Sequence, residues 1–150
     1  MMTADQTARN KASAQRIWEE IFPACDVEGL AAVTDPELIG HGRRPDEPAG
    51  FEGIKQTMLW LTTVFSDQRW EIHQVIGDGD LVAVHGTHHA RHTGSLFGIP
   101  ATGREVAYPY VHILRFRDGR AIEHWGVRDD MTLMRQLGVI PAHPAGARPA

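Results

Sequence analysis

The sequence predicts an α+β domain whose helices cover one face of a curved antiparallel sheet. Up to about residue 65, apolar residues recur three and four positions apart, which is the spacing of one helix face. From Arg69 onward, apolar and polar residues alternate, as in half-buried strands. The turn sequences Gly77-Asp78-Gly79-Asp80 and Asp118-Gly119 separate these alternating runs. Helices followed by a meander of strands define the α+β class, and such a sheet can wrap into a cone around a pocket.

Three helices are expected in the first part of the chain. The first covers about Gln6–Phe22, where the apolar side chains form a single stripe. Asp26 is expected to cap a short second helix over 27–33. The segment 35–50 is rich in proline and glycine and is predicted to be a long irregular loop. The third helix begins near Phe51 and is apolar over a wide arc, so it is expected to be buried.

Four strands and a terminal helix are expected after that. The strands are predicted at 70–76, 81–91, 105–117 and 120–128. Asp129 or Asp130 then caps a short last helix. We therefore expect a single domain over residues 1–140, followed by a flexible Pro/Ala-rich tail over 141–150.

Composition excludes several classes of protein. The 150 residues fit one domain, and 15 Lys plus Arg against 19 Asp plus Glu give a net charge of −4. This balance argues against a nucleic-acid partner, which requires a basic surface. No apolar run approaches the roughly 20 residues of a membrane span, and the polar N-terminus does not resemble a secretory signal. Cys25 is the only cysteine, so a cytoplasmic protein without an internal disulfide is expected.

Strand alternation assigns residues to faces. On the third strand, one face carries the large aromatic residues Tyr108, Tyr110 and Phe116 together with His112. This face is therefore predicted to line the interior. On the last strand, the face with Trp125 and Asp129 is chosen as the pocket face. Asp129 would then lie at the mouth of an apolar pocket, where desolvation raises the pKa of a carboxyl and makes it a proton shuttle. The alternatives are that Asp129 only caps the last helix and that His112 is a hydrogen-bonded core histidine.

The chain has nine histidines, four of them within residues 85–92. A strand directs His88 and His92 to one face and His85 and His89 to the other, so the four cannot converge on a metal ion. We therefore expect no metal site here, and ordinary hydrogen bonds for these side chains.

Two runs of sequence resemble a known family. His92-Thr93-Gly94-Ser95-Leu96-Phe97-Gly98-Ile99-Pro100, followed by Thr102-Gly103-Arg104, is similar to the central signature of SnoaL-like polyketide cyclases, within the NTF2-like superfamily. The later run Phe116-Arg117-Asp118-Gly119-Arg120, then Glu123-His124-Trp125, Asp129 and Arg135-Gln136-Leu137-Gly138, extends the likeness. The resemblance covers Trp18 to Gly138.

The resemblance implies an NTF2-like cone, a homodimer, and catalysis without a metal or an organic cofactor. Founding members close a ring in aromatic polyketide esters by an intramolecular aldol condensation, with an aspartate near the end of the last strand as general acid/base. Asp129 matches that position best, His112 matches a pocket histidine, and His41 stands where relatives often carry a histidine. Many relatives carry another acid directly after the tryptophan, where this chain has Gly126. A shuttle at that position would be missing here.

The predicted function is a cofactor-independent cyclase or isomerase that performs acid/base chemistry on a hydrophobic polyketide-like carbonyl compound. The catalytic candidates are Asp129 and His112, and the substrate-binding candidates are His41, Phe65, His88, Tyr108 and Trp125. One alternative is a water-activating enzyme like the limonene-epoxide hydrolases, for which Arg69 and Arg104 would be the nearest arginines. The other is a non-catalytic small-molecule-binding module. The apolar second face of the sheet, with Ala107, Val111 and Ile113, is expected to bury itself in a dimer.

Overall fold

The first helical segment is divided into three parts in the computed structural model of the chain, which describes residues 2–142. Helix α1 (Ala4–Arg16) begins after Thr3, which forms a reciprocal capping box with Gln6. A π-helical turn, η1 (Ile17–Ile21), follows, and α2 (Phe22–Ala24) ends the segment. The predicted helix is confirmed, but the helical spacing of apolar residues did not reveal the π turn. This turn buries three of its residues against the sheet: Ile17, Trp18 and Ile21.

The next two helices follow the prediction closely. Helix α3 (Val27–Val33) begins at Asp26, whose carboxylate accepts a hydrogen bond from the backbone N–H of Gly29 at 2.9 Å. Helix α4 (Phe51–Val64) is buried as expected along one side, at Met58, Leu61 and Val64.

All five strands belong to one sheet with the order β1-β5-β4-β3-β2. Four are antiparallel neighbours: β2 (Phe65–Asp78), β3 (Leu81–His92), β4 (Glu105–Arg117) and β5 (Arg120–Arg128). The turn between the last two contains Asp118 and Gly119 with φ of 51° and 79°. Two consecutive positive φ values suit a two-residue hairpin, and this is why the Asp-Gly pair predicted it.

The edge strand β1 (Thr34–Gly40) corrects the sequence prediction. The segment 35–50 was expected to be irregular throughout, but 35–40 pairs with β5 in parallel orientation. Pro36 masked the strand because proline weakens a strand pattern, although an edge position tolerates it. Leu38 anchors the strand in the core, where it is 3% exposed.

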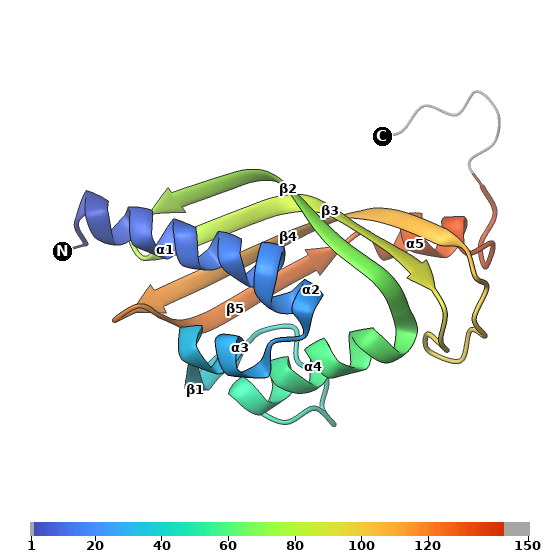
Figure 1. The fold of residues 1–150 in the computed structure, drawn as a ribbon, viewed down its shortest axis with the longest axis horizontal. Coiled ribbons are helices and arrows are strands. Elements are labelled where there is room, and N and C mark those ends of the chain that lie inside the picture. The colour runs from blue at the N-terminus through green and yellow to red at the C-terminus, as the bar shows by residue number, and fades with distance from the viewer. Residues whose placement is uncertain (1, 143–150) are drawn as a thin grey trace.

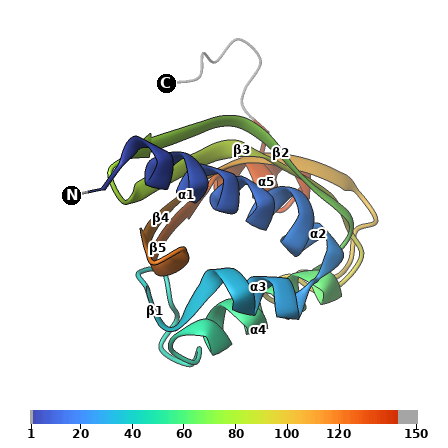
Figure 2. The ribbon, with the colours of Figure 1, turned by 60° about the vertical axis from the view of Figure 1, so that its left-hand side comes forward.

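The sheet curves around the N-terminal helices. Figure 2 shows β2 and β3 arching over α1, with α3 and α4 on the opposite side of the molecule, and Figure 1 shows α1 running along the concave face. The face of β4 predicted to be interior is confirmed, since its residues are buried at nearly every position: Val106, Tyr108, Tyr110, Leu114 and Phe116. The observed architecture is thus the expected α+β cone.

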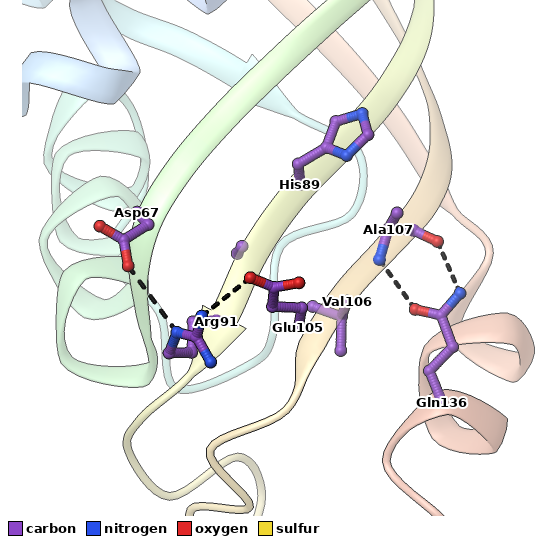
Figure 3. A pocket seen from close by; sticks show the side chains of 8 residues that line it. Asp67, His89, Arg91, Glu105, Val106, Ala107 and Gln136 are labelled. Atoms are coloured by element: carbon purple, nitrogen blue, oxygen red, sulfur yellow. Dashed lines mark hydrogen bonds and ion pairs between the residues drawn. The ribbon is translucent and has the colours of Figure 1, made fainter.

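The terminal helix α5 (Asp130–Gln136) is tied to a free edge of β4. β5 pairs with β4 only as far as Tyr110, so the preceding β4 residues have no strand on that side. The Gln136 amide takes the place of a neighbouring strand here. Its oxygen accepts from the Ala107 N–H at 2.8 Å, and its nitrogen donates to the Ala107 carbonyl at 2.7 Å (Figure 3). The Gln in the Arg-Gln-Leu-Gly run therefore has a structural role.

Replacing Gln136 with leucine leaves both Ala107 backbone groups without partners, and we expect it to lower the free energy of unfolding by about 1–3 kcal/mol. Urea denaturation followed by circular dichroism measures this. Glutamate, which can accept from Ala107 but not donate to it, should give an intermediate loss. An unchanged midpoint for the leucine variant would contradict the role assigned to Gln136.

Among the helices within residues 2–142, none is both long and apolar enough to cross a bilayer. Residues 143–150, which make up most of the predicted tail, lie outside the described part of the chain. The single domain expected over 1–140 and the flexibility expected of the tail remain predictions.

Candidate active site

A cavity of about 320 Å³ lies inside the cone, between the helices and the concave face of the sheet. Apolar side chains from η1, α2, α3 and α4 form much of its wall. Its chemically active lining is aromatic and comes mainly from the sheet: Trp18, Trp70, His88, Tyr108, Tyr110, His112 and His124. Pockets of this kind, mostly apolar with a few convergent polar groups, are typical of small-molecule sites.

A second hollow, of about 410 Å³, lies on the outside between β3, β4 and α5 (Figure 3). Its polar groups already bind one another. Arg91 donates to Glu105 at 2.8 Å and lies 3.9 Å from Asp67, and Gln136 is held by Ala107. Because these groups are paired, we assign this hollow to the structure of the domain rather than to ligand binding.

The first polar pair in the cavity consists of two histidines on neighbouring strands. His112 Nδ1 and His124 Nε2 lie 2.9 Å apart, which is hydrogen-bonding distance. Gly126 lies directly opposite His112 in the β4–β5 register. A Cβ at Gly126 would lie 3.0 Å from His112 Nδ1 and 3.2 Å from His124 Cε1, so the absence of a side chain leaves room for this pair.

Both histidines of this pair are held neutral. Burial is the main cause that lowers the pKa of His112 well below its usual 6.5, and the neighbouring His124 adds to it. Burial likewise lowers the pKa of His124 to about 4. One ring nitrogen at the shared hydrogen bond carries the proton and the other accepts it. When His112 Nδ1 is the donor, His112 Nε2 is left as an unprotonated base.

The second polar pair joins β3 to β4. His88 Nδ1 lies 2.6 Å from the Tyr108 hydroxyl. Two of the three cavity histidines are also stacked on a tryptophan. The ring centroids of His112 and Trp18 lie 3.9 Å apart with 11° between the ring planes, and those of His88 and Trp70 lie 4.1 Å apart with 9° between the planes. These stacks fix the orientation of both imidazoles.

Three polar atoms of cavity-lining side chains are buried without a hydrogen-bond partner among residues 2–142: Trp18 Nε1, His88 Nε2 and Tyr110 Oη. Buried polar groups in folded proteins are nearly always paired, because an unpaired one costs the lost hydration. Three such atoms belong to side chains that line one cavity, which makes this cavity the candidate site for a ligand.

Among the residues predicted from the sequence, His88, Tyr108 and His112 line the cavity together. Phe65 is 3% exposed and packs behind them, with its ring centroid 5.6 Å from that of His88 and 6.4 Å from that of Tyr108. It supports the wall without being part of the lining.

The pocket face predicted for β5 is wrong. Ala121, His124, Gly126 and Arg128 line the cavity, whereas Trp125 faces outward. There it stacks on His41 at 4.6 Å, and His41 Nε2 lies 2.7 Å from Glu123 Oε1. The rule that the bulkier side chain lies inside failed for Trp125, because the His41 ring packs on its indole on the outer face. His41 and Trp125 are therefore not placed to contact a ligand in the cavity.

The predicted position of Asp129 is also wrong. It is exposed and serves as the N-cap of α5, accepting hydrogen bonds from the backbone N–H of Thr132 at 2.9 Å and from its hydroxyl at 2.7 Å. These bonds lower the pKa of Asp129, the opposite of the expected rise. The carboxylate that does line the cavity is Asp130, which is ion-paired with Arg128 at 3.2 Å.

Asparagine at position 129 keeps the cap but removes the carboxylate, so we expect the Asp129→Asn variant to retain the stability and any turnover of the parent protein. Alanine removes the cap and should cost about 1 kcal/mol of stability, again with little effect on turnover. Thermal denaturation and a turnover assay separate the two effects. A fall in turnover of 100-fold or more in Asp129→Asn would restore this residue as the catalytic acid.

Sequence reasoning missed several lining residues. His124 and Arg128 were assigned to the outer face, and Trp18 was read only as part of a helix stripe. Arg69 and Arg104 were named as the nearest arginines, but Arg69 lies 3.7 Å from Glu71 and Arg104 donates to the Gln136 carbonyl, both away from the cavity lining. The sequence did hold a signal for His124: it lies two residues from Gly126 on the same strand, so the two share a face.

The histidines of β3 alternate as predicted. His88 and His92 are buried, and His85 and His89 are partly exposed on the other face. Ordinary hydrogen bonds engage three of them: His88 to Tyr108, His89 to Glu71 and His92 to Thr102. Within residues 2–142, no three His, Cys, Asp or Glu side chains are grouped as metal ligands.

The fold and the cavity define a class, the small α+β cones that enclose a ligand site. Residues 12–137 match the profile of the SnoaL-like polyketide cyclases. The chain is 33% identical over 133 residues to the aklanonic acid methyl ester cyclase DnrD of Streptomyces peucetius, covering 87% of this chain and 92% of that protein. The chain therefore belongs to the SnoaL-like polyketide cyclase family.

Solved structures agree with this assignment. TsrD from Streptomyces laurentii superposes with a TM-score of 0.78 at 26% identity, covering 86% of this chain and 97% of that one. IdmH from Streptomyces antibioticus gives a TM-score of 0.76 at 28% identity, covering 87% and 99%. The shared cone extends over nearly the whole of both relatives.

Proposed function

We propose that this protein closes a ring in a flat, polyketide-like methyl ester by an intramolecular aldol reaction within the cone. The observation that carries the proposal is the enclosed aromatic cavity, in which a neutral histidine pair lies beside buried polar atoms that lack partners. Aklanonic acid methyl ester, named for the relative DnrD, is the substrate class that we assign first.

The reaction begins with removal of a proton from carbon next to a carbonyl. In our proposal His112 Nε2 accepts this proton while His112 Nδ1 donates to His124, 2.9 Å away. The resulting imidazolium is stabilised by that second ring. A polyphenolic ketone ester already has acidic C–H bonds, so a modest base in a dry pocket suffices.

The enolate carbon then attacks the ketone carbonyl, forming one C–C bond and one alkoxide. The proton held by His112 returns to the alkoxide, so atoms and charge balance without an oxidant or reductant. The donor that we propose for the enolate oxygen is Tyr110, whose ring centroid lies 5.2 Å from that of His112 and whose hydroxyl lacks a partner among residues 2–142.

The histidine pair also explains how the chain can do without an acid at Gly126, the position where many relatives carry one. That position faces the cavity, directly opposite His112. An acid there would occupy the space that the His112–His124 pair uses here. We propose that the pair supplies the proton transfer that a carboxylate would supply at this position.

A second function, ligand binding without catalysis, is favoured by one observation. Asp129 is exposed and saturated by Thr132, which leaves the predicted acid outside the cavity. A binding protein would use the same aromatic walls and the same unpaired polar atoms without needing a base.

Incubating the purified protein with aklanonic acid methyl ester and separating the products by chromatography distinguishes the two functions. We expect an isomer of unchanged mass whose NMR spectrum shows one additional ring. Binding without a new isomer, detected as quenching of tryptophan fluorescence, would support the binding protein and contradict the cyclase.

We also propose a homodimer formed through the outer face of the sheet. Val127 is 70% exposed, and the neighbouring Val111 and Ile113 are partly exposed on that face. Light scattering tests this, and a monomeric mass would contradict it. The single cysteine favours a cytoplasmic location.

A further inference from the structure

The second polar pair in the cavity, His88 and Tyr108, takes no part in the proton transfer described above. His88 lies on β3 opposite Tyr108 on β4 and Trp70 on β2, on the concave face. The Trp70 ring stacks on one side of its imidazole, and Phe65 meets it edge-on at 5.6 Å and 82°. His88 is 3% exposed, so it is held rigidly inside the protein.

The hydrogen bond to Tyr108 determines which nitrogen of His88 carries the proton. Among residues 2–142, the Tyr108 hydroxyl has His88 Nδ1 as its only polar partner, at 2.6 Å. If Nδ1–H donated to the phenol, both the phenol proton and Nε2 would be left unpaired. If the phenol donates to Nδ1, a single group is left over, the Nε2–H. Fewer unsatisfied groups favour this second tautomer.

We propose that His88, through its Nε2–H, is a neutral hydrogen-bond donor to a carbonyl oxygen of the ligand, and that Tyr108 fixes the tautomer that makes this possible. Nε2 is buried without a partner among residues 2–142, although His88 lines the cavity. A neutral N–H selects an acceptor oxygen, such as that of a ketone or quinone. An ammonium group, which can only donate, would leave it unsatisfied.

Burial supports the neutral state. It lowers the pKa of His88 to about 3, with the nearby Arg128 guanidinium as a smaller cause. The imidazole therefore stays uncharged at neutral pH, like other histidines that polarise a carbonyl as a neutral group. Burial also raises the pKa of Tyr108, so the phenol keeps its proton and remains the donor.

The position of His88 predicts where the ligand carries this oxygen. His88 pairs with Tyr108, which precedes the proposed base His112 by four residues on the same face of β4. Four residues of strand span about 13 Å between Cα atoms, so a ligand that reaches from the base to His88 is extended. We infer a flat, fused-ring ligand whose distal ring carries a carbonyl bound by His88. His88 is therefore a specificity residue, and the inference rests on the proposed function only for the identity of the reacting end.

Imidazole ¹⁵N NMR of the free protein tests the tautomer directly. We expect His88 to carry its proton on Nε2 in the parent protein and to populate both tautomers in Tyr108→Phe. A proton on Nδ1 in the parent protein would overturn the proposal. Because this measurement needs no ligand, its outcome is independent of whether the protein is a cyclase.

Fluorescence titration with aklanonic acid methyl ester tests the contact. His88→Phe keeps an aromatic ring for Trp70 but removes the donor. We expect Kd or KM to rise roughly tenfold with kcat nearly unchanged, and the His88 Nε2 resonance of the parent protein to shift on saturation. Equal affinity for parent and His88→Phe, or an unshifted resonance, would overturn the inference. A shift without turnover would uphold it while refuting the cyclase. His85→Gln, on the opposite face of β3, is the matched control.

Discussion

Replacing His112 with glutamine is expected to lower kcat for ring closure by about 100- to 10,000-fold, the usual effect of removing one general acid/base group. Glutamine keeps a polar group beside His124 but cannot accept the α-proton. KM should change little, because the aromatic walls remain. Steady-state turnover of aklanonic acid methyl ester, monitored by the appearance of the cyclised isomer, measures the effect.

The second histidine of the pair gives the internal control. His124 acts through His112 in our proposal, so it is a positioning residue, and His124→Gln should lower kcat less than His112→Gln does. Its effect should appear in kcat and leave KM nearly unchanged. His85→Gln, on the outer face of β3, should leave both constants unchanged. Undiminished turnover in His112→Gln would remove this residue from the mechanism.

Acid is expected to unfold this protein at a higher pH than a domain without buried histidines. The folded-state pKa values of His88 and His124 are lowered to about 3 and about 4, and that of His112 lies well below 6.5. Groups with a depressed folded pKa stabilise the fold fully above their unfolded pKa of 6.5. That stability is lost as the pH falls toward the folded values, because the unfolded chain takes up the protons first.

From pH 6.5 to 5, His88 and His124 are each expected to lower the free energy of unfolding by about 2 kcal/mol, and His112 acts in the same direction. His88 and His124 together amount to about 4 kcal/mol, a large part of the total stability of a typical domain. Urea denaturation at a series of pH values measures the slope. His88→Phe should remove about 2 kcal/mol of the loss between pH 6.5 and 5, and His85→Gln should leave the slope unchanged. A free energy of unfolding that is flat from pH 6.5 to 5 would show that these rings are not buried neutral.

The sequence was informative where a local rule acts alone. Helical spacing located α4, the Asp26 side chain marked the start of α3, and Asp-Gly marked the last hairpin, because each signal depends on neighbouring residues only. The edge strand β1 was missed because its pairing with β5 connects distant parts of the chain and tolerates Pro36. The π turn at Ile17–Ile21 leaves the apolar spacing almost unchanged.

The candidate site was predictable on β4 but not on β5. On β4, the run of alternating large residues left no doubt about the inner face, and Tyr108 and His112 followed from it. On β5, both faces carry bulky or polar groups, and a register shift beside Phe116 changes the parity. The indole of Trp125 is covered from outside by His41, and the Arg115 guanidinium lies 6.0 Å from its ring centroid. The residue pattern within one strand cannot reveal that side chains from other segments will pack on its outer face.

Hydrogen exchange at the reacting carbon tests the central claim, that the His112–His124 pair removes an α-proton inside the cone. The substrate is incubated with the protein in D₂O, and deuterium at the carbon next to the ketone and in the cyclised product is followed by NMR. We expect the parent protein to accelerate incorporation and His112→Gln to return it to the rate without protein. Incorporation by His112→Gln at the parent rate would contradict the account.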